Sequence, residues 1–267
     1  MSVYADLIRY RDLYGNLFRR DLEARYKGSV LGVAWSLANP VLLMAIYLVV
    51  FSVIWQASFT DVDHYGLFLL SGLAPWIFFS TSLQTAARSM LDSANLIRKT
   101  RFPRQLVPLS VVAANVISFG AMLAGLLVLN FALLPRVRAT EWTAIPVAAL
   151  IVCLTAGLAL ALASLNVLFR DIEHLTAALL VPWFFLTPIL YPLSGLPARV
   201  EQHHVLVQAI HWGNFVSPAV EALRDPLYAG RLPRAGDVLY LVVAAACSLA
   251  LGAFVFSRVD DRLAVEL

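Results

Sequence analysis

The chain has 267 residues, of which 60% are hydrophobic and 14% are charged. A soluble protein of this size usually carries about a quarter charged residues, whereas the mean hydropathy of this chain is +0.77. The composition therefore predicts an integral membrane protein and excludes an ordinary soluble enzyme. The net charge of +3 is too small and too dispersed to suggest a nucleic-acid partner.

Residues 3–23 are predicted to form an amphipathic helix that lies in the membrane surface. Apolar and tyrosine side chains form one stripe along it: Val3, Leu7, Tyr10, Tyr14, Leu17 and Phe18. Charged residues occupy the opposite face, and this segregation suits the boundary between headgroups and acyl chains. A soluble helix that packs on a partner protein is the alternative.

Six stretches are long and apolar enough to cross a membrane, which takes about 20 helical residues. They are Val33–Ala57, Gly66–Ala87, Leu106–Leu134, Trp142–Phe169, Leu175–Tyr191 and Val238–Ser257, called spans 1 to 6. Span 5 is the shortest and contains two prolines, so we expect it to be kinked or broken. The predicted fold is an all-α integral membrane protein with one domain over residues 1–267, in which a lead-in (1–32) precedes a six-span core (33–257).

Basic residues predict the orientation of the spans. With the N-terminus inside, the inner segments hold fourteen of the twenty basic residues and the outer segments hold six. Cytoplasmic loops carry the excess of Lys and Arg. Both termini are therefore predicted to be cytoplasmic, in a multi-pass protein of the cytoplasmic membrane.

The outer region between spans 5 and 6, residues 192–236, is too apolar for a plain loop. Within it, Val205–Leu223 has a single acidic residue but contains Gly213, Asn214 and Pro218. Such a piece is unsuited to a full crossing, because irregular backbone is tolerated at membrane depth only against protein or a cavity. We expect one or two short re-entrant helices here.

Several kinds of chemistry are missing from the sequence. It contains no phosphate-binding loop of the G-x-x-x-x-G-K-[ST] type, and no acidic pair lies inside a span, as an ion-coupled carrier would need. His203, His204 and His211 are interpreted as exposed or interfacial histidines rather than metal ligands. The charged cluster Arg170–His174 favours a turn fixed by ion pairs over a catalytic site.

Segment Arg88–Gln105 combines apolar residues at helical spacing with five basic residues. Asp92 or Ser93 is a candidate helix cap, and Pro103 would help to end the helix. A short basic helix between two spans is either a connector on the membrane surface or a handle for a soluble partner.

Aromatic residues gather on three spans. Tyr47, Phe51 and Trp55 share one face of span 1. Further aromatics are Trp76, Phe78 and Phe79 in span 2, and Trp183, Phe184, Phe185 and Tyr191 in span 5. Sugars stack on aromatic faces, so these rings could guide a glycan; lipid-facing or helix-packing rings are the alternative.

A set of ordered motifs resembles the membrane permease subunits of bacterial ABC-2 type polysaccharide exporters, over nearly the whole chain. The motifs are Asp21–Trp35 with Pro40, Gly72–Ser80, Asn95–Lys99 with Phe102–Arg104, Phe169–His174, Pro188–Tyr191, and Asn214 and Pro218 with Arg224–Asp225. One departure is visible, because three residues separate Asn214 from Pro218, whereas the family pattern has the two adjacent.

This resemblance implies a homodimer of permeases that associates with two copies of a nucleotide-binding ATPase subunit. ATP and Mg²⁺ would bind to that partner, so this chain would hold no cofactor or metal and would not be an enzyme. The substrate would be a lipid-linked polysaccharide of the O-antigen, teichoic acid or galactan type. An ABC-2 permease for another lipid or drug is the alternative; a polyprenol-dependent membrane glycosyltransferase, with Asp171, Glu173 and His174 as its catalytic groups, is less favoured.

The resemblance also implies roles for particular residues. The cytoplasmic loop 88–104 would couple to the ATPase through Leu91, Asn95, Ile97, Arg98, Lys99 and Arg101. A channel between two permeases would be lined by Tyr47, Phe51, Trp55, Trp76, Phe79, Trp183, Phe185 and Tyr191. The outer gate would include Asn214, Pro218 and Arg224. A pyrophosphate headgroup would be drawn to basic residues near the inner ends of the spans: Arg25, Lys27 and Arg88.

Overall fold

The structure is a computed structural model, which describes residues 4, 6, 9–26, 42, 46, 49–50, 64–99, 102–133, 139–193 and 204–266, without the side chains of 24–26, 204, 206 and 261–266. Most of predicted span 1, including Tyr47, Phe51 and Trp55, lies outside the described residues. So do Lys27, Arg101 and the side chain of Arg25.

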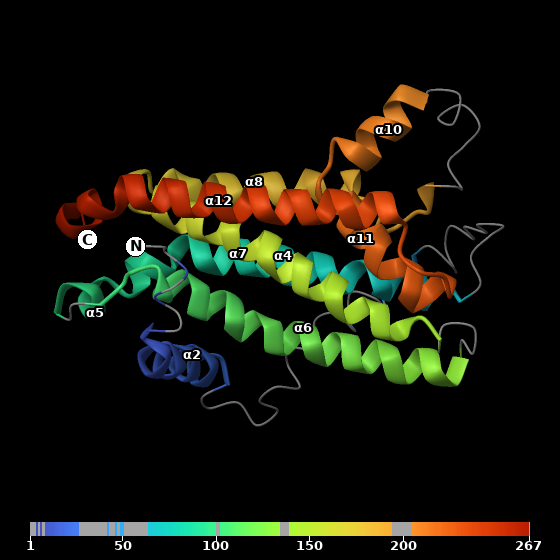
Figure 1. Ribbon diagram of the computed structural model, residues 1–267, viewed down its shortest axis with the longest axis horizontal. Helices are drawn as coiled ribbons and strands as arrows, with labels where there is room; N and C mark the ends of the chain where they lie inside the picture. Colours follow the sequence, from blue (N-terminus) through green and yellow to red (C-terminus); the bar gives the residue numbers. More distant parts are fainter. Residues whose placement is uncertain are drawn as a thin grey trace.

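Four long apolar helices form the body of the molecule. They are α4 (Tyr65–Asp92), α6 (Leu106–Leu133), α7 (Ala144–Leu168) and α12 (Ala235–Glu266). All four run along the long axis of the bundle (Figure 1), and each is long and apolar enough to cross a membrane. They confirm predicted spans 2, 3, 4 and 6, and the described residues contain helices but no strand.

Predicted span 5 is helix α8 (Asp171–Leu186), which begins and ends earlier than expected. The helix continues through Pro182 but stops within the predicted span, so the expected interruption falls at the second of its two prolines. The helix ends at Thr187, directly before Pro188, because the residue that precedes a proline is biased away from helical backbone. With 16 residues, α8 is shorter than the four membrane-crossing helices of the described chain.

Helix α4 lies at the centre of the bundle. In its most apolar segment 78% of the residues are buried, compared with 22% in the corresponding segments of α6 and α12. The Phe78 ring of α4 stacks on the Phe119 ring of α6 with 4.8 Å between the centroids. The outer helices therefore keep apolar side chains on their surface, as a lipid environment requires.

Helices α7 and α12 approach each other through two glycines. A Cβ atom at Gly157 would overlap the backbone of Ser248, and one at Gly252 would overlap the carbonyl oxygen of Gly157. The Ser248 hydroxyl donates a hydrogen bond to the Leu154 carbonyl oxygen at 2.6 Å. Small residues allow close backbone approach between membrane helices, where van der Waals packing stabilises the pair.

A helix near the N-terminus, α2 (Arg11–Tyr26), packs against α6. Its Tyr14 hydroxyl donates to the Leu109 carbonyl oxygen at 3.2 Å, and its Asp21 carboxylate accepts from the Ser110 hydroxyl at 2.7 Å. Leu17 is buried, as its place in the apolar stripe predicts. The predicted amphipathic helix is therefore present over residues 11–23, and the described residues 6 and 9 are helical as well.

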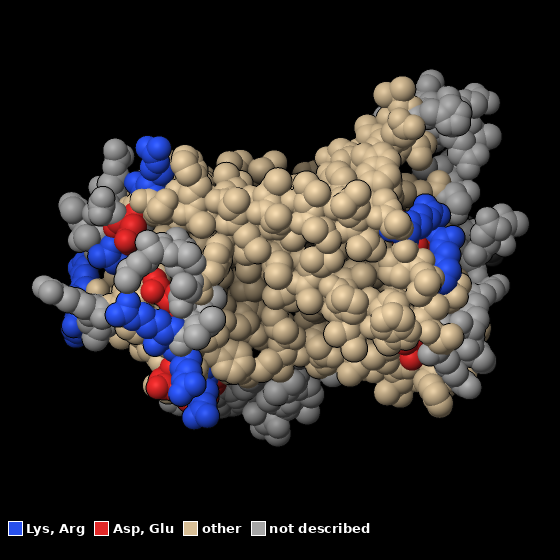
Figure 2. Space-filling view, viewed as in Figure 1, with Lys and Arg blue, Asp and Glu red and all other residues tan. Residues whose placement is uncertain are grey.

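Charged residues lie at the two ends of the bundle, and the space-filling view shows an uncharged band between them (Figure 2). Helices α2 and α5 (Ala94–Lys99) and the last turns of α12 mark one end, which we call the α5 end. Helices α10 (His204–Trp212) and α11 (Val216–Arg224) mark the other, the α11 end. This distribution is that of a protein with an apolar belt between two aqueous surfaces.

The glycine contact predicts a matched pair of stability effects. Gly157→Ala should lower the free energy of unfolding by about 1–3 kcal/mol, because the added methyl group overpacks the α7–α12 contact. Gly125→Ala on α6, where an added Cβ would meet no atom within 4 Å, should leave it unchanged or slightly raised. Thermal unfolding of the purified protein in detergent measures both, and equal midpoints would contradict the close approach.

Candidate functional site

At the α5 end, helix α4 is followed directly by the short helix α5. Ser93 separates them, and its carbonyl oxygen accepts hydrogen bonds from the Leu96 and Ile97 amides. The basic helix expected in this loop is therefore present. The first two apolar residues of segment Arg88–Gln105, Met90 and Leu91, belong to the last turn of α4 rather than to this short helix.

Burial divides the predicted ATPase-coupling residues into two groups. Asn95, Arg98 and Lys99 are exposed at the end of the bundle, whereas Ile97 is buried and Leu91 is half-buried. Ile97 belongs to the same apolar cluster as Leu17 of α2. The exposed three can therefore meet another protein, and the apolar two hold α5 in place.

Ion pairs connect the α5 end to the rest of the molecule. Arg88 lies 3.5 Å from Glu173 of α8 and 3.4 Å from Asp92. Arg104 donates to Asp260 of α12, at 2.6 Å to the carbonyl oxygen and 3.0 Å to the carboxylate. All of these side chains are partly or largely exposed. Arg88, a predicted headgroup-binding residue, is already paired with two carboxylates.

The junction of α7 and α8 is the expected charged turn. The side-chain oxygen of Asn166 accepts a hydrogen bond from the Glu173 amide at 2.9 Å, and the Ile172 amide donates to the Phe169 carbonyl oxygen. The carboxylate of Glu173 meets Arg88 of α4 rather than a residue of its own turn. The cluster thus joins α4, α7 and α8.

At the α11 end, helices α10 and α11 and the helical turn η5 (Asp225–Ala229) confirm that the region contains short helices. Nearly all of α11 is buried against α4, α7 and α12. Asn130 of α6 donates to the Leu227 carbonyl oxygen, and the Thr140 hydroxyl donates to that of Pro226 at 3.0 Å. These bonds fasten η5 across the ends of α6 and α7.

Arg224, a predicted gate residue, is the central polar group of this end and is 4% exposed. Its guanidinium donates to the Pro188 carbonyl oxygen at 2.8 Å, to that of Ile189 at 3.3 Å and to the Glu221 carboxylate at 2.6 Å. Burial lowers the pKa of Arg224 from its ordinary value, and the Glu221 carboxylate opposes that effect. Each charge of the Arg224–Glu221 pair is therefore balanced by the other.

The surroundings of Arg224 are fitted to its side chain. The guanidinium carbon lies 3.9 Å from the centroid of the Phe68 ring of α4, within the range of a cation–π interaction. A Cβ atom at Gly72 would lie 2.5 Å from Nη2 of Arg224. A larger residue at position 72 would therefore force the guanidinium to shift, so the glycine of the Gly72–Ser80 motif suits the observed position of Arg224.

Asn214, the second predicted gate residue, connects α8 to α11. Its side-chain oxygen accepts from the Trp183 indole N–H at 2.7 Å and the Val216 amide at 3.1 Å, while its amide nitrogen donates to the Thr187 hydroxyl at 2.9 Å. Pro218 is buried in α11, four residues further on. The three residues between them are the N-cap Phe215 and the first two residues of α11, so the departure from the family pattern still produces an ordered junction.

Two further polar pairs lie beside Arg224. Arg231 binds the buried carboxylate of Asp225 through Nε at 2.8 Å and Nη2 at 2.6 Å. His211 and Asp237 meet with Nε2 and Oδ1 2.8 Å apart, and both are buried. The interpretation of His211 as an exposed or interfacial histidine is therefore wrong, because its partner is an aspartate that begins the next long helix.

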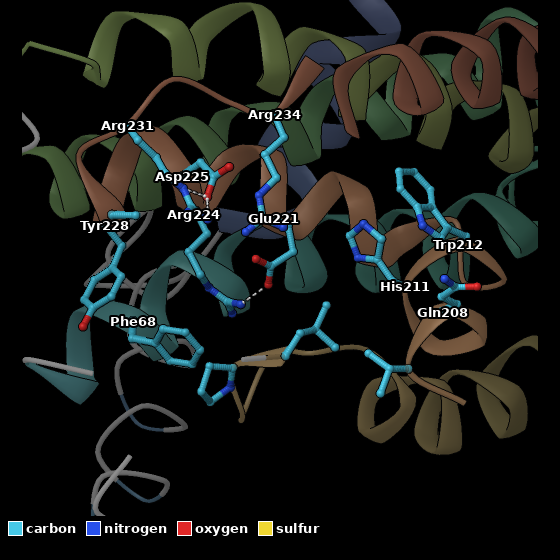
Figure 3. A pocket seen from close by; sticks show the side chains of 14 residues that line it. Phe68, Gln208, His211, Trp212, Glu221, Arg224, Asp225, Tyr228, Arg231 and Arg234 are labelled. Atoms are coloured by element: carbon cyan, nitrogen blue, oxygen red, sulfur yellow. Dashed lines mark hydrogen bonds and ion pairs between the residues drawn. The ribbon is translucent and has the colours of Figure 1, made fainter. Parts of the chain in front are cut away.

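A cavity of about 550 Å³ is lined by most of these side chains, namely Arg224, Glu221, Asp225, Arg231 and His211. Figure 3 shows Arg224, Glu221 and His211 side by side along one wall, with Tyr228 at one end and Trp212 at the other. Arg234 also lines it. Among the described residues, no group of three or more histidine, cysteine or acidic side chains could hold a metal ion.

The predicted channel aromatics have different environments. Trp76 and Phe79 are buried inside the bundle, where they contact Phe184 and Trp183 with 5.7 Å between ring centroids in each case. Phe185 is 58% exposed, and Trp183 and Tyr191 are half-buried. Of the predicted set with described side chains, Phe185 offers the largest free surface.

Sequence reasoning misses most partners of the gate residues. Phe68 and Asp237 are not recognisable as partners in the sequence, because each meets its partner only through the tertiary fold. Glu221 is recognisable, since it lies three residues before Arg224 on the same helix. The available signal is three acidic residues within an apolar region, Glu221, Asp225 and Asp237, close to Arg224, Arg231 and Arg234. Buried charges require partners, so this run of opposite charges indicates paired residues.

Comparisons with known proteins find relatives along most of the chain. The profile of the ABC-2 type transporter family matches residues 13–228. The chain is 35% identical over 265 residues, 98% of each chain, to the O-antigen export system permease protein RfbA of Myxococcus xanthus. It is 33% identical over 189 residues to the protein of that name from Klebsiella pneumoniae (70% of this chain, 72% of the relative). The polysialic acid transport protein KpsM of Escherichia coli is 20% identical over 252 residues (92% of this chain, 93% of the relative).

The Arg224–Glu221 pair predicts non-additive effects of substitution. Arg224→Leu should lower the free energy of unfolding by about 3–5 kcal/mol, because it leaves the Glu221 carboxylate without its partner. The double substitution Arg224→Leu/Glu221→Leu should recover part of that loss. Thermal unfolding in detergent measures these two variants and the single variant Glu221→Leu, with Arg258→Leu at the α5 end as an exposed control. A double variant that loses the sum of the two single effects would show that the two charges act independently.

Proposed function

This chain belongs to the ABC-2 type transporter family, and on that premise we propose that it is the membrane permease subunit of an ATP-driven exporter of a lipid-linked polysaccharide. The observation that carries the proposal is the similarity to an O-antigen export permease along 98% of both chains. The match to a polysialic acid transport protein over 92% of this chain extends it to a second polysaccharide.

Energy for export comes from a separate subunit in this proposal. The sequence has no phosphate-binding loop, and the bundle consists of apolar helices with charges at its ends. A nucleotide-binding ATPase would supply the conformational work, and two copies of it would act on a homodimer of this chain. The permease would then alternate between two packings that nucleotide binding stabilises to different extents.

The α5 end is the contact for that ATPase in this proposal. Asn95, Arg98 and Lys99 are exposed there, while Ile97 anchors the helix to α2. The Arg88–Glu173 and Arg104–Asp260 ion pairs connect the same end to α8 and α12. A displacement of α5 would therefore be transmitted to the helices that reach the α11 end.

The orientation follows from the distribution of basic residues. Cytoplasmic segments carry the excess of Lys and Arg, and the segments at the α5 end hold more of them than those at the α11 end. We place the α5 end and both termini in the cytoplasm and the α11 end outside, in the cytoplasmic membrane. The buried cluster around Arg224 would then lie at the exit of the transport path.

The alternatives are less well supported. A permease for another lipid or a drug would share the fold, but the similar proteins are named for O-antigen and polysialic acid. A membrane glycosyltransferase would need free acidic or histidine groups near an interface. Glu173, one candidate, is paired with Arg88 and positioned by Asn166, which is the environment of a structural residue.

Charge reversal at α5 tests the coupling role. Arg98→Glu/Lys99→Glu should reduce surface glycan by at least about tenfold, because charge pairs at protein interfaces are worth several kcal/mol. Arg258→Glu, an exposed arginine of α12 at the same end, is the control and should export normally. Surface glycan is measured in cells that produce the permease with its ATPase, after the amount of each variant in the membrane has been matched. Wild-type export by the double variant would refute the coupling role.

The assignment of ATP hydrolysis to a partner has a direct test. The purified chain, reconstituted into lipid nanodiscs, should release no phosphate from ATP, because it lacks a phosphate-binding loop. A preparation of the same chain with its ATPase is the positive control. Turnover by the permease alone that persists after removal of contaminating ATPases would overturn the two-subunit mechanism.

A further inference from the structure

The angle between helices α4 and α5 is set at one residue, Ser93. Its φ of −100° and ψ of 11° depart from the helical backbone in which α4 ends. Its amide donates to the Ser89 carbonyl oxygen of α4, and its carbonyl oxygen accepts from the Leu96 and Ile97 amides of α5. Both backbone groups of Ser93 are therefore used within its own segment, and its side-chain hydroxyl is the group that another helix can contact.

Arg20 of α2 makes that contact. Its Nη2 donates to the hydroxyl oxygen of Ser93 at 3.2 Å, and Ser93 is buried. Helix α5 has six residues and buries one of them, Ile97. Because a helix so short depends on its neighbours for stability and direction, the polar contact with α2 adds to the apolar anchor that Ile97 provides.

The guanidinium of Arg20 is itself held in place. Its Nε and Nη2 donate to Oδ1 of Asp21 at 3.1 and 2.8 Å. The other carboxylate oxygen of Asp21, Oδ2, accepts from the Ser110 hydroxyl of α6 at 2.7 Å, and this aspartate side chain is 12% exposed. Two adjacent residues of α2 thus form a polar chain from Ser93, at the α4–α5 junction, to Ser110 of α6.

The rest of α2 gives this chain a fixed base. Figure 1 shows α2 beside α6, with α5 at the same end of the bundle. Tyr14 donates to a carbonyl oxygen of α6, and Leu17 is buried in the apolar cluster that also contains Ile97. The position of α2 is therefore set by its packing on α6, and Arg20 contacts the α4–α5 junction from there.

We propose that Arg20 is a positioning residue for ATPase coupling: through Ser93 it fixes the angle at which α5 presents its exposed residues to the ATPase. The use of α5 in coupling rests on the proposed function, whereas the contact with Ser93 stands on the geometry of α2. A movement delivered to α5 is then shared with α2 and α6 through the same polar chain. Without the contact, α5 would still reach the ATPase but would transmit less of its movement.

This role differs from ordinary stabilisation of the fold. The side chain of Arg20 is 43% exposed, and ionic contacts of such side chains contribute little to the free energy of unfolding. Loss of the Arg20–Ser93 bond should therefore leave the unfolding temperature unchanged while α5 opens locally more often. Amide hydrogen exchange measures local opening of this kind.

Hydrogen exchange of the full chain in lipid nanodiscs tests the contact, with mass spectrometry of fragments that contain α5. Arg20→Gln and Ser93→Ala should each speed exchange of the Leu96 and Ile97 amides about three- to tenfold, the change that one ordinary hydrogen bond makes in an equilibrium. The double variant should exchange no faster than either single variant, because both remove the same bond. Arg19→Gln is the matched control and should exchange like the wild type, since Arg19 is exposed on the same helix and makes no polar contact among the described residues.

Export and ATP hydrolysis test the coupling. In cells that produce the permease with its ATPase, surface glycan should fall about threefold or more for Arg20→Gln and for Ser93→Ala, in line with the loosening of α5. The amount of each variant in the membrane is matched first. ATP hydrolysis by the purified complexes should remain close to that of the wild type, because the substitutions do not touch the nucleotide site of the ATPase. Arg19→Gln should change neither quantity.

The contact is refuted if exchange in α5 is the same in Arg20→Gln as in the wild type, or if Arg19→Gln speeds it equally. Two further results refute the positioning role. Faster exchange with normal export would show that Arg20 holds α5 without affecting the coupling, and a joint fall of ATP hydrolysis and unfolding temperature would show a role in the fold alone. The proposed function fails separately, if wild-type cells export no glycan through this chain, and the exchange results do not depend on it.

Discussion

A charged side chain buried within the bundle needs compensation at every donor that water no longer reaches, and Arg224 imposes this constraint on the α11 end. Its guanidinium binds two carbonyl oxygens directly after α8 and the carboxylate of Glu221, and it lies over the ring of Phe68. Three elements that are distant in sequence are thereby held at one point. The absence of a Cβ at Gly72 provides the space that this arrangement needs.

The two ends of the bundle differ in the kind of interaction that holds them. At the α5 end the ion pairs of Arg88 and Arg104 are partly exposed, and such pairs contribute at most about 1 kcal/mol each. At the α11 end the pair of Arg224 is buried and its loss is costly. Under the proposed function, the weakly held end receives the movement of the ATPase, whereas the strongly held end passes between defined arrangements at the exit.

Helix positions were predicted well where one physical signal dominates. The apolar stretches of spans 2, 3 and 4 differ from α4, α6 and α7 by only a few residues at most ends, because a run of about 20 apolar residues leaves the backbone few alternatives to a helix. Prediction was less exact where neighbours decide. Of the two prolines in predicted span 5, Pro182 lies inside α8 and the helix stops before Pro188. The contacts of the Trp76 and Phe79 rings with α8 come only from the tertiary fold.

The sequence by itself determined the membrane location, the all-helical class, the short helices near Asn214 and the exposed basic segment at Arg98 and Lys99, because composition, periodicity and punctuation by proline and glycine are local properties. Only the tertiary structure decided which distant polar groups meet. Arg224 lies three residues from Glu221 but reaches carbonyl groups 35 and 36 residues away, and His211 finds Asp237 across 26 residues. Pairing of buried polar groups depends on where the helices bring them together, and no local pattern encodes that distance.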